Sequence, residues 1–560
     1  MSDSSSNKEY IVTLKNNGDL DNFYTDMEES GGSEKVPDRQ VECVDRRKIS
    51  RNTHYKLTED EVSKLKSDDR VLAIEEPYYN RGFEPTLTWD AAQDGNWDKS
   101  PDAASDKNWG LKRCIDAQQT ANWGTDGTSQ ITGSVNTTSS GKNVDVIIAD
   151  EHINFGHPEF RENPDGTGNL RSNEFNWFQY SSALGYSTAE TYTYGGTGSH
   201  GTHTAGTTAG NTQGWARDAN IYSIAFDKNL VAGAPANWPY WLWDYVRYFH
   251  NNKPINATTG RRNPTIMNNS WGYNYNSPLW LEYTTSVNYR GTSTSLTGTD
   301  AEKKAVLESK RVPVIGDYEG ELYLQKLPGR IAGVDADIQD LIDDGIIVVG
   351  SAGNDYWPMD VSGGEDYDNT ITNTLPSPTV WDTGKGATPG AADNVICVGN
   401  IDTTVTEYKR PSSNFEERVD IWAPGSNIMS SVFNSTSGYY NSQQDPRDSS
   451  YYNAYVSGTS MSCPQISGLL ACLAEQWPNM KAADALQFLK EGCKAQVATT
   501  GTVVTSPYQA LGESNNRYVY YVYKRPQTGT VFPHDNFGNR NESTAGVKYP
   551  RLNRTVTKRS

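Results

Sequence analysis

Apolar and polar residues alternate near the start of the chain in a way that is typical of a small mixed unit. The stretch EYIVTLK alternates like a strand, and a second apolar run, RVLAIEE, ends at Pro77. Between them Thr58 and Glu61 have the spacing of a capping box at a helix N-terminus. We therefore expect an α+β unit over residues 9–77, preceded by a disordered polar start over residues 1–8.

From Trp109 onward, short apolar runs alternate with helical stretches. NVDVIIAD, NIYSIAF, PTIMNNSWG and GIIVVGSAGN are predicted strands, while VDADIQDLIDD and PQISGLLACLAEQW have helical spacing. Strands that alternate with helices indicate an α/β domain with a mostly parallel sheet and helices on both faces. We expect this domain over residues 109–524, with a linker over 78–108 and a basic extended tail over 525–560.

Composition narrows the classes of partner. The chain has 560 residues and a formal net charge of −19, which disfavours nucleic acid as a general partner. No stretch approaches the length of uninterrupted apolar sequence that spans a membrane, so we expect no membrane partner. The start, MSDSSSNKEY, contains no basic segment followed by an apolar one, and so no ordinary secretory signal is visible.

The six cysteines are widely spaced and form no CxxC pair, which disfavours a zinc site and a redox dithiol. Several lie in apolar stretches such as VICVG and LLACLA, so we interpret them as buried free thiols, with one disulfide as the alternative. They are Cys43, Cys114, Cys397, Cys463, Cys472 and Cys493.

Two histidines, His200 and His203, stand in the stretch GTGSHGTHTAGTTAG. An HxxH pair is sometimes a zinc site, but the glutamate of an HExxH motif is missing here. We therefore expect no metal at these histidines and no required cofactor. A structural calcium ion, held by an acidic loop such as SGGEDYDN, stays an open alternative.

Three more polar residues stand where a parallel sheet presents reactive groups. Asp150 ends an apolar strand, Asn354 follows another, and Ser460 lies on a Gly-rich turn that enters an apolar helix. In open α/β sheets, reactive groups gather beyond the carboxyl ends of the strands. Taken singly, these residues would be a strand-end cap, a turn residue and a helix N-cap.

Together with His200, they supply every role that a serine nucleophile needs. A serine hydroxyl is a poor nucleophile at neutral pH and needs a histidine base, which in turn needs a carboxylate to hold its tautomer. The oxyanion that forms needs hydrogen-bond donors aimed at it. The joint occurrence of Asp150, His200, Asn354 and Ser460 therefore points to a catalytic site.

At this point the chain resembles the subtilisin-like serine peptidases. The motifs that carry the likeness are IIAD, HPEF, HGTHTAG, NNSWG, SAGN, DIWAPG and GTSMSCP, spread over residues 109–523, with Asp, His and Ser in the order of that family. The resemblance implies that Asp150 orients the imidazole, His200 is the general base, Ser460 is the nucleophile and Asn354 donates to the oxyanion. It also implies a structural role for His203.

The same resemblance implies a substrate cleft. One side would be an edge strand that pairs with the substrate backbone, and the other the far wall of the pocket for the residue before the cut. The edge strand is Ser270, Trp271 and Gly272, and the wall is Ser351, Ala352 and Gly353. Pro389 matches a position where the family carries a cis proline.

The unit over residues 9–77 resembles the inhibitory propeptide of the family. We therefore expect it to dock on the cleft as an intramolecular inhibitor, with the chain after Pro77 paired to the Ser-Trp-Gly edge. Self-cleavage between Tyr78 and Asn108 should then follow, because tethering raises the effective concentration of this segment to roughly millimolar.

Three features depart from the family pattern. Glu151 and His152 replace a pair that is usually small, and a second carboxylate beside Asp150 could disturb its titration. The loop after HGTHTAG is short, closer to proteinase K than to many subtilisins. Two long insertions, roughly residues 274–332 and 355–390, flank the expected cleft and could cap it or bind a partner.

Two functions therefore compete. The first is a serine endopeptidase acting on peptide or protein substrates through an acyl-enzyme, favoured by the complete set of catalytic residues and the propeptide-like unit. The second is a catalytically weak or self-cleaving structural or assembly protein, such as a virion component, favoured by the missing signal, the Glu151-His152 pair and the basic tail.

Overall fold

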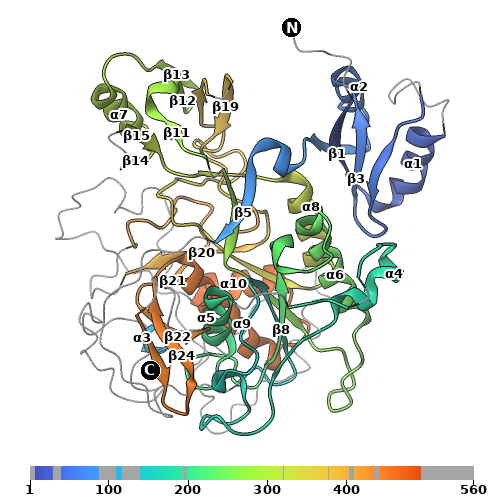
Figure 1. Ribbon diagram of the computed structural model, residues 1–560, viewed down its shortest axis with the longest axis vertical. Coiled ribbons are helices and arrows are strands. Elements are labelled where there is room, and N and C mark those ends of the chain that lie inside the picture. The colour runs from blue at the N-terminus through green and yellow to red at the C-terminus, as the bar shows by residue number, and fades with distance from the viewer. Residues whose placement is uncertain are drawn as a thin grey trace.

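The computed structural model describes the chain in eleven stretches (Figure 1). They are residues 7–29, 39–87, 109–116, 139–189, 191–194, 198–275, 277–318, 321–375, 377–402, 409–433 and 441–492. The expected basic tail, most of the expected linker and Cys493 lie outside them. The expected disordered start is wrong at its end, because Lys8 already begins the first strand.

A seven-stranded parallel sheet forms the centre of the molecule, which confirms the α/β prediction. Along the sheet the order is β21-β20-β17-β9-β6-β8-β7, and every pair of neighbours is parallel. The strands are β6 (Asp145–Asp150), β7 (Ser172–Asn173), β8 (Asn220–Ala225), β9 (Thr265–Asn269), β17 (Ile347–Ser351), β20 (Ile396–Ile401) and β21 (Ile421–Pro424).

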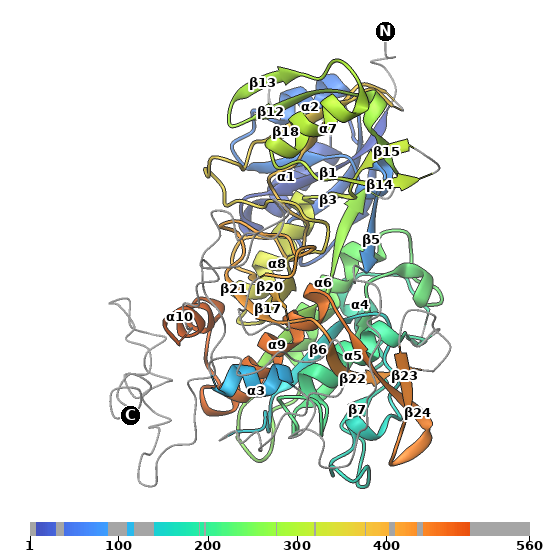
Figure 2. The ribbon, with the colours of Figure 1, turned by 90° about the vertical axis from the view of Figure 1, so that its left-hand side faces the viewer.

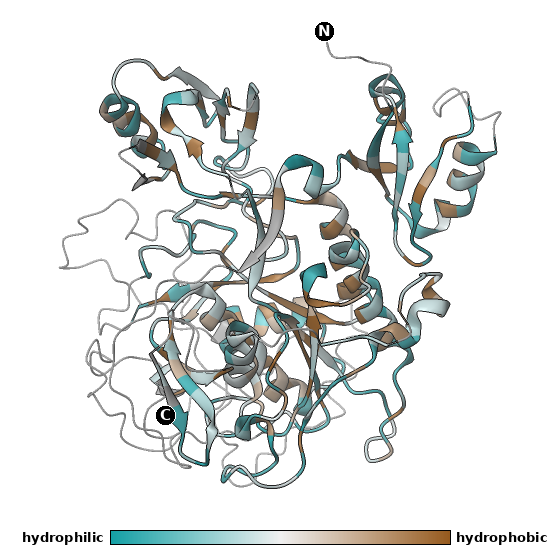
Figure 3. Cartoon of the chain, viewed as in Figure 1, coloured by the Kyte–Doolittle hydropathy of each residue, from teal (hydrophilic) through white to brown (hydrophobic). Residues whose placement is uncertain are grey.

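Successive residues of the central strands point into two different hydrophobic cores. On β6, Val146 and Ile148 belong to the core under α5 and α9, while Ile147 and Ala149 belong to the core under α6 and α8. Figure 3 shows how hydrophobic these central strands are. The main helices are α5 (Ser199–Ala209), α6 (Trp238–Asn252), α8 (Ala332–Asp343), α9 (Thr459–Gln476) and α10 (Ala482–Gly492), with the shorter α3 (Trp109–Asp116) and α4 (Ser181–Leu184).

The N-terminal unit is an antiparallel sheet of order β2-β3-β1-β4, covered by two helices and with a core of its own. The capping box is confirmed: Glu61 donates its backbone N–H to the Thr58 hydroxyl, and its carboxylate accepts the N–H of Thr58. The elements are β1 (Lys8–Leu14), α1 (Leu20–Glu28), β2 (Cys43–Arg46), β3 (Asn52–Leu57), α2 (Glu59–Leu65) and β4 (Val71–Glu75). The sequence pattern did not predict α1, β2 or β3.

The two long insertions meet in one antiparallel sheet of order β13-β12-β18-β19. Figures 1 and 2 place this sheet and the N-terminal unit at the same end of the molecule. The strands are β12 (Thr284–Tyr289), β13 (Thr292–Ser295), β18 (Thr370–Asn373) and β19 (Thr379–Asp382). Near them lie β11 (Leu279–Trp280), α7 (Asp300–Ser309), β14 (Val314–Tyr318) and β15 (Glu321–Leu324).

Six more strands form two small antiparallel sheets. An edge sheet has the order β16-β10-β5, with β5 (Phe83–Leu87), β10 (Trp271–Tyr275) and β16 (Leu327–Pro328). A second has the order β22-β24-β23, with β22 (Ile428–Val432), β23 (Asn441–Asp445) and β24 (Asp448–Val456). Short 3₁₀ turns include η2 (Tyr78–Arg81), which leads from the N-terminal unit into β5.

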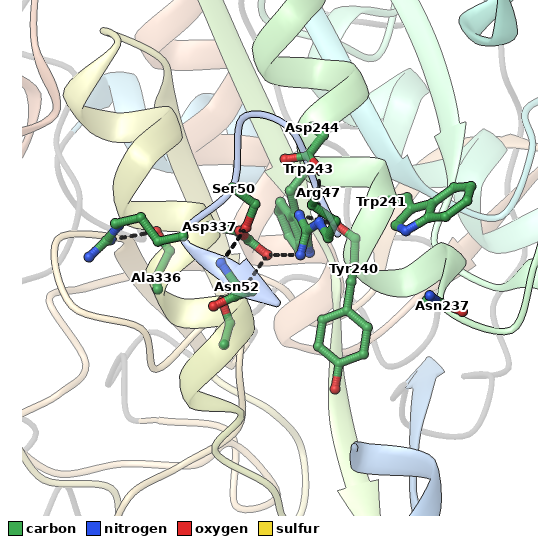
Figure 4. A network of polar contacts seen from close by, with 12 residues as sticks. Arg47, Ser50, Asn52, Asn237, Tyr240, Trp241, Trp243, Asp244, Ala336 and Asp337 are labelled. Carbon is green, nitrogen blue, oxygen red and sulfur yellow. Dashed lines mark hydrogen bonds and ion pairs between the residues drawn. The ribbon is translucent and has the colours of Figure 1, made fainter. Parts of the chain in front are cut away.

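A buried arginine fastens the N-terminal unit to α6 and α8 (Figure 4). Arg47 is fully buried, and its guanidinium pairs with Asp244 of α6 at 2.8 Å and with Asp337 of α8 at 2.7 Å. Ser50 donates to the other oxygen of Asp337 at 2.6 Å, and Asn52 donates to Oδ2 of Asp337 at 3.1 Å. One positive charge is therefore shared between two buried carboxylates of the α/β domain.

We expect Arg47→Ala to weaken the docking of the N-terminal unit by about 3–5 kcal/mol, because it leaves two buried carboxylates without a counter-charge. The free energy can be measured by urea titration, with hydrogen exchange in β3 as the signal for undocking. Arg46→Ala is the matched control: its side chain is 44% exposed, and its pair with Glu28 should contribute about 0–1 kcal/mol. Equal losses in both variants would contradict the role assigned to Arg47.

Candidate active site

Asp150 and His200 form the innermost part of the site, at the carboxyl end of the sheet. Asp150 is the last residue of β6 and is fully buried, and its Oδ1 accepts a hydrogen bond from Nδ1 of His200 at 2.8 Å. The same carboxylate accepts the backbone N–H of Glu151 at 2.8 Å and the hydroxyl of Thr204 at 3.3 Å. Three donors compensate the burial of this charge, and they hold the imidazole with its proton on Nδ1.

The two histidines of the HGTH motif have different environments. Burial alone would lower the pKa of His200, but the carboxylates of Asp150 and Glu151 raise it, and the net pKa lies above its ordinary value. His203 donates from Nε2 to the carbonyl of Ile428 at 2.9 Å, and burial lowers its pKa to about 3. His200 is therefore placed to take up a proton, while His203 stays neutral and structural.

Ser460 lies in the first turn of α9 and is tied to the edge strand. Its hydroxyl donates to the carbonyl of Ser270 at 3.0 Å, and the Ser270 hydroxyl donates to the carbonyl of Ser460 at 3.0 Å. Gly458, just before the helix, has a φ of 151°, a value that favours glycine. Because α9 packs beside α5 (Figure 1), Ser460 and His200 lie in the first turns of neighbouring helices. Their direct convergence stays a prediction.

Asn354 is held by the residue that precedes the serine. Its Oδ1 accepts the backbone N–H of Thr459 at 2.8 Å, and the Thr459 hydroxyl accepts the backbone N–H of Gly353 at 3.1 Å. These two bonds join the end of β17 to the start of α9. They also orient the amide, so that its NH₂ group is the end turned away from Thr459.

The segment Ser351–Ala352–Gly353, the expected pocket wall, is held by a residue that the sequence motifs missed. Asn414 donates from Nδ2 to the carbonyl of Ala352 at 2.9 Å, and its Oδ1 accepts the backbone N–H groups of Asp355 and Trp357 at 3.1 and 2.9 Å. Its own backbone N–H donates to the carbonyl of Gly353 at 2.9 Å. Asn414 stands in PSSNF, and nothing in that short stretch signals a contact with SAGN.

The Ser270–Trp271–Gly272 edge lies in β10 and at its start. The Trp271 side chain is 1% exposed and stacks on Phe226 and Trp243, so it belongs to the hydrophobic core. Gly272 forms a bridge with Pro389, and the Thr388–Pro389 bond is cis, as predicted.

β5 pairs antiparallel with β10, which confirms the expected pairing of the chain after Pro77 with the Ser-Trp-Gly edge. Leu87 stands opposite Trp271, and Phe83 opposite Tyr275. The first ten residues of the expected linker are therefore ordered, as η2 and β5. The linker prediction was wrong for them, because composition alone does not reveal pairing with a distant strand.

Glu151 occupies the N-terminus of α5. Gly198, the N-cap residue, has no side chain to cap the helix, and the Glu151 carboxylate accepts the backbone N–H of His200 at 3.3 Å instead. A Cβ atom on Gly198 would lie 1.6 Å from that carboxylate. Burial raises the pKa of Glu151, His200 lowers it, and the net shift is upward. His152 points elsewhere, into an edge contact with Tyr192.

The remaining chemical candidates have structural explanations. In the acidic loop SGGEDYDN, the Asp366 carboxylate pairs with Arg290 at 2.8 Å and with Arg311 at 3.2 Å. Within the described stretches, no group of three or more His, Cys, Asp or Glu side chains is arranged to hold a metal ion. No helix of those stretches is long and apolar enough to cross a membrane.

The burial predicted for the cysteines is confirmed for Cys114, Cys397, Cys463 and Cys472, while Cys43 is half-buried.

Comparison with known proteins points to one family. The model of the subtilase family, peptidase S8, matches residues 141–507, which is more than half of the chain. Subtilisin-like protease 1 of Pseudogymnoascus destructans is 30% identical over 142 residues, 25% of this chain and 25% of that protein. Subtilisin-like protease 3 of Arthroderma otae is 25% identical over 369 residues, 66% of this chain and 61% of that protein. The chain therefore spans about a quarter of the length of the first curated relatives it matches.

Two solved structures are also similar. Fervidolysin from Fervidobacterium pennivorans, a keratinolytic enzyme related to subtilisin, is 16% identical with a TM-score of 0.46, over 93% of this chain and 61% of that one. A cold adapted subtilisin-like serine proteinase is 18% identical with a TM-score of 0.41, over 74% of this chain and 97% of that one.

The family model covers the central sheet and the segments that carry Asp150, His200, Asn354 and Ser460. This chain belongs to the subtilase family.

Proposed function

We propose that the chain is a serine endopeptidase, made as a precursor whose N-terminal unit occupies and inhibits its own cleft. The observation that carries the proposal is the 2.8 Å contact between the buried Asp150 carboxylate and Nδ1 of His200 in a chain of this family. This contact leaves Nε2 as the ring atom that would accept a proton from Ser460.

Catalysis would proceed through an acyl-enzyme. Ser460 Oγ attacks the substrate carbonyl carbon while its proton passes to Nε2 of His200, and the Asp150 carboxylate stabilises the imidazolium that forms. The developing oxyanion accepts hydrogen bonds from the Asn354 NH₂ group and the backbone N–H of Ser460 at the N-terminus of α9. His200 then protonates the leaving amine, and water enters by the reverse route to release the acid. For attack, the Ser460 hydroxyl has to turn from the Ser270 carbonyl toward His200.

The register of β5 indicates where the precursor would first be cut. Leu87 stands opposite Trp271, one residue along from Ser270, whose carbonyl oxygen lies 3.0 Å from Ser460 Oγ. A peptide bond within one or two residues after Leu87 is therefore the expected first substrate, inside the predicted range from Tyr78 to Asn108. The pairing of β5 with β10 supports the inhibitor proposal, because an inhibitor that resembles a substrate would bind through main-chain hydrogen bonds.

A catalytically weak or self-cleaving structural protein is the competing proposal. The buried Arg47 network favours it, because a cut N-terminal unit held by that network would leave the cleft only slowly. The two proposals differ in whether the purified chain turns over an added peptide after the first cut.

We expect the wild-type chain to cut itself and yield a fragment of about 50–52 kDa, by residue share of the 62.0 kDa chain. Ser460→Ala should stay full length, because it lacks the nucleophile. Ser462→Ala is the matched control: this neighbouring serine donates to the carbonyl of Thr459 at 3.0 Å and should not affect the cut. Intact mass and labelling by a fluorophosphonate probe are the measurements. A wild-type chain that neither cuts itself nor labels at Ser460 would refute the peptidase.

Glu151→Gln should lower the pKa of His200, because it removes one of two carboxylates that stabilise the imidazolium. The amide oxygen still caps α5, so the fold is kept. The pKa can be followed by NMR of histidine-labelled Ser460→Ala protein, whose seven histidines include His203 as a ring that stays neutral above pH 4. A His200 pKa that is unchanged by the substitution would show that Glu151 acts only as a helix cap.

Docking of the N-terminal unit should weaken as the pH rises from about 4 to about 7. Burial raises the pKa of Asp337 to about 7 despite the opposing effect of Arg47, and the pKa of Glu75 and Asp340, beside the same interface, is raised as well. The docked form therefore binds more protons than the released form in this range, and raising the pH favours release.

The measurement is hydrogen exchange in β3 of the full-length Ser460→Ala chain at pH 5.5 and 8, corrected for the intrinsic rates. Asp337→Asn should reduce the pH dependence, because it mimics the protonated carboxyl. The other titratable groups that face this site include Asp244, Tyr186, Tyr240 and Tyr273. Slower corrected exchange at pH 8 than at pH 5.5 would contradict the prediction.

A further inference from the structure

A cavity of about 680 Å³ lies beside β5, at its end away from Ser460. One part of its wall belongs to the N-terminal unit and to the start of β5, including Glu76, Arg81 and Phe83. The other part belongs to the α/β domain and its insertions. If the N-terminal unit is cut and released, the part of the wall in the α/β domain remains with the enzyme. It consists of Tyr275, Pro328, Gly329, Arg330, Ser377, Thr379, Val380, Trp381 and Asp382.

The aromatic ring of Phe83 packs against the part of the wall that belongs to the α/β domain and its insertions. Its side chain is 8% exposed, and its ring makes edge-to-face contacts with Trp381 at 6.1 Å and with Tyr275 at 6.3 Å between centroids. Tyr275 and Trp381 contact each other at 4.5 Å. These are the geometries that aromatic pairs prefer, so the site distinguishes an aromatic ring from an aliphatic chain of similar size.

The backbone beneath the ring leaves space for it only because residue 329 is a glycine. A Cβ atom on Gly329 would lie 2.4 Å from Cδ1 of Phe83. Gly329 directly follows β16, which pairs with β10 on the side opposite β5. The floor of the cavity is therefore part of the same edge sheet that holds β5.

The wall that carries Trp381 comes from the insertions. Trp381 lies in β19, which pairs with β18, and β18 pairs with β12 of the other insertion. Two insertions that are far apart in sequence thus cooperate to place one indole beside the edge strand.

We propose that this cavity is a substrate subsite that selects an aromatic side chain at the position opposite Tyr275, four residues before the one opposite Trp271. The proposal rests on the proposed peptidase function, because β5 stands in for a substrate strand that pairs with β10. The substrates would be extended polypeptides with Phe, Tyr or Trp well upstream of the cut, and the insertions would set this preference.

The test compares two synthetic peptides as substrates of the self-processed enzyme. One has the sequence of residues 78–92, and the other carries alanine in place of Phe83. We expect kcat/KM to fall about tenfold for the alanine peptide, the effect of losing two ring contacts. Trp381→Ala should remove most of this difference. Leu375→Ala is the matched control, an exposed apolar residue of the same insertion outside the cavity wall, and should leave the difference intact.

Gly329→Ala tests the subsite independently, in case Trp381→Ala fails to fold. It keeps Trp381 but narrows the space under the ring, so it should slow the cleavage of the phenylalanine peptide and leave that of the alanine peptide unchanged. Equal kcat/KM values for both peptides on the wild-type enzyme would overturn the subsite and leave the peptidase standing.

If no peptide is cleaved and the chain neither cuts itself nor labels at Ser460, the proposed function fails, and hydrogen exchange decides the subsite separately. In the full-length Ser460→Ala chain, a second substitution, Phe83→Ala, should speed the exchange of the β10 amides several-fold, and Leu375→Ala should not. Unchanged exchange in β10 would overturn the role of the cavity in holding an aromatic residue.

Discussion

The Asp150 carboxylate is a completely buried charge, and several groups of the site compensate it by donating hydrogen bonds. Such a charge is tolerated only when donors surround it, and here they come from the next residue and from the first two turns of α5. This requirement determines where α5 begins relative to the end of β6. The imidazole of His200 acquires its position and its tautomer as a consequence, and Glu151 completes the arrangement by accepting the backbone N–H of His200.

A second set of hydrogen bonds links Ser460, the proposed nucleophile, to the start of β10. Ser460 and Ser270 exchange two hydrogen bonds, and Thr459 is joined to Asn354 and Gly353. The start of α9 is therefore fixed against two strand ends at the same time. A shift of β10 would move the serine with it, so in the proposed mechanism the alignment of a substrate with β10 would also align it with Ser460 Oγ.

The sequence predicted well those features that depend on neighbours in the chain. The Thr58–Glu61 capping box and the parallel strands with their buried runs are local patterns, and the structure confirms them. Asn414, Gly329 and Trp381 were missed because each acts through a contact with a residue that is far away in sequence. Helix α1 was missed for another reason: its apolar residues are few, and its buried face became apparent only against the sheet of the N-terminal unit.

Two of the contacts that attach the N-terminal unit to the α/β domain differ in physical character. At one a guanidinium neutralises buried carboxylates on α6 and α8, and at the other a strand and an aromatic ring lie along β10. Only the second contact has to be given up before another polypeptide can bind β10. Because the first is made to α6 and α8 rather than to β10, we expect that in the proposed precursor a cut strand can leave β10 and return while the unit stays docked. In that proposal the opening of β10 and the loss of the N-terminal unit are separate events, and the strength of the buried ion pairs sets the interval between them.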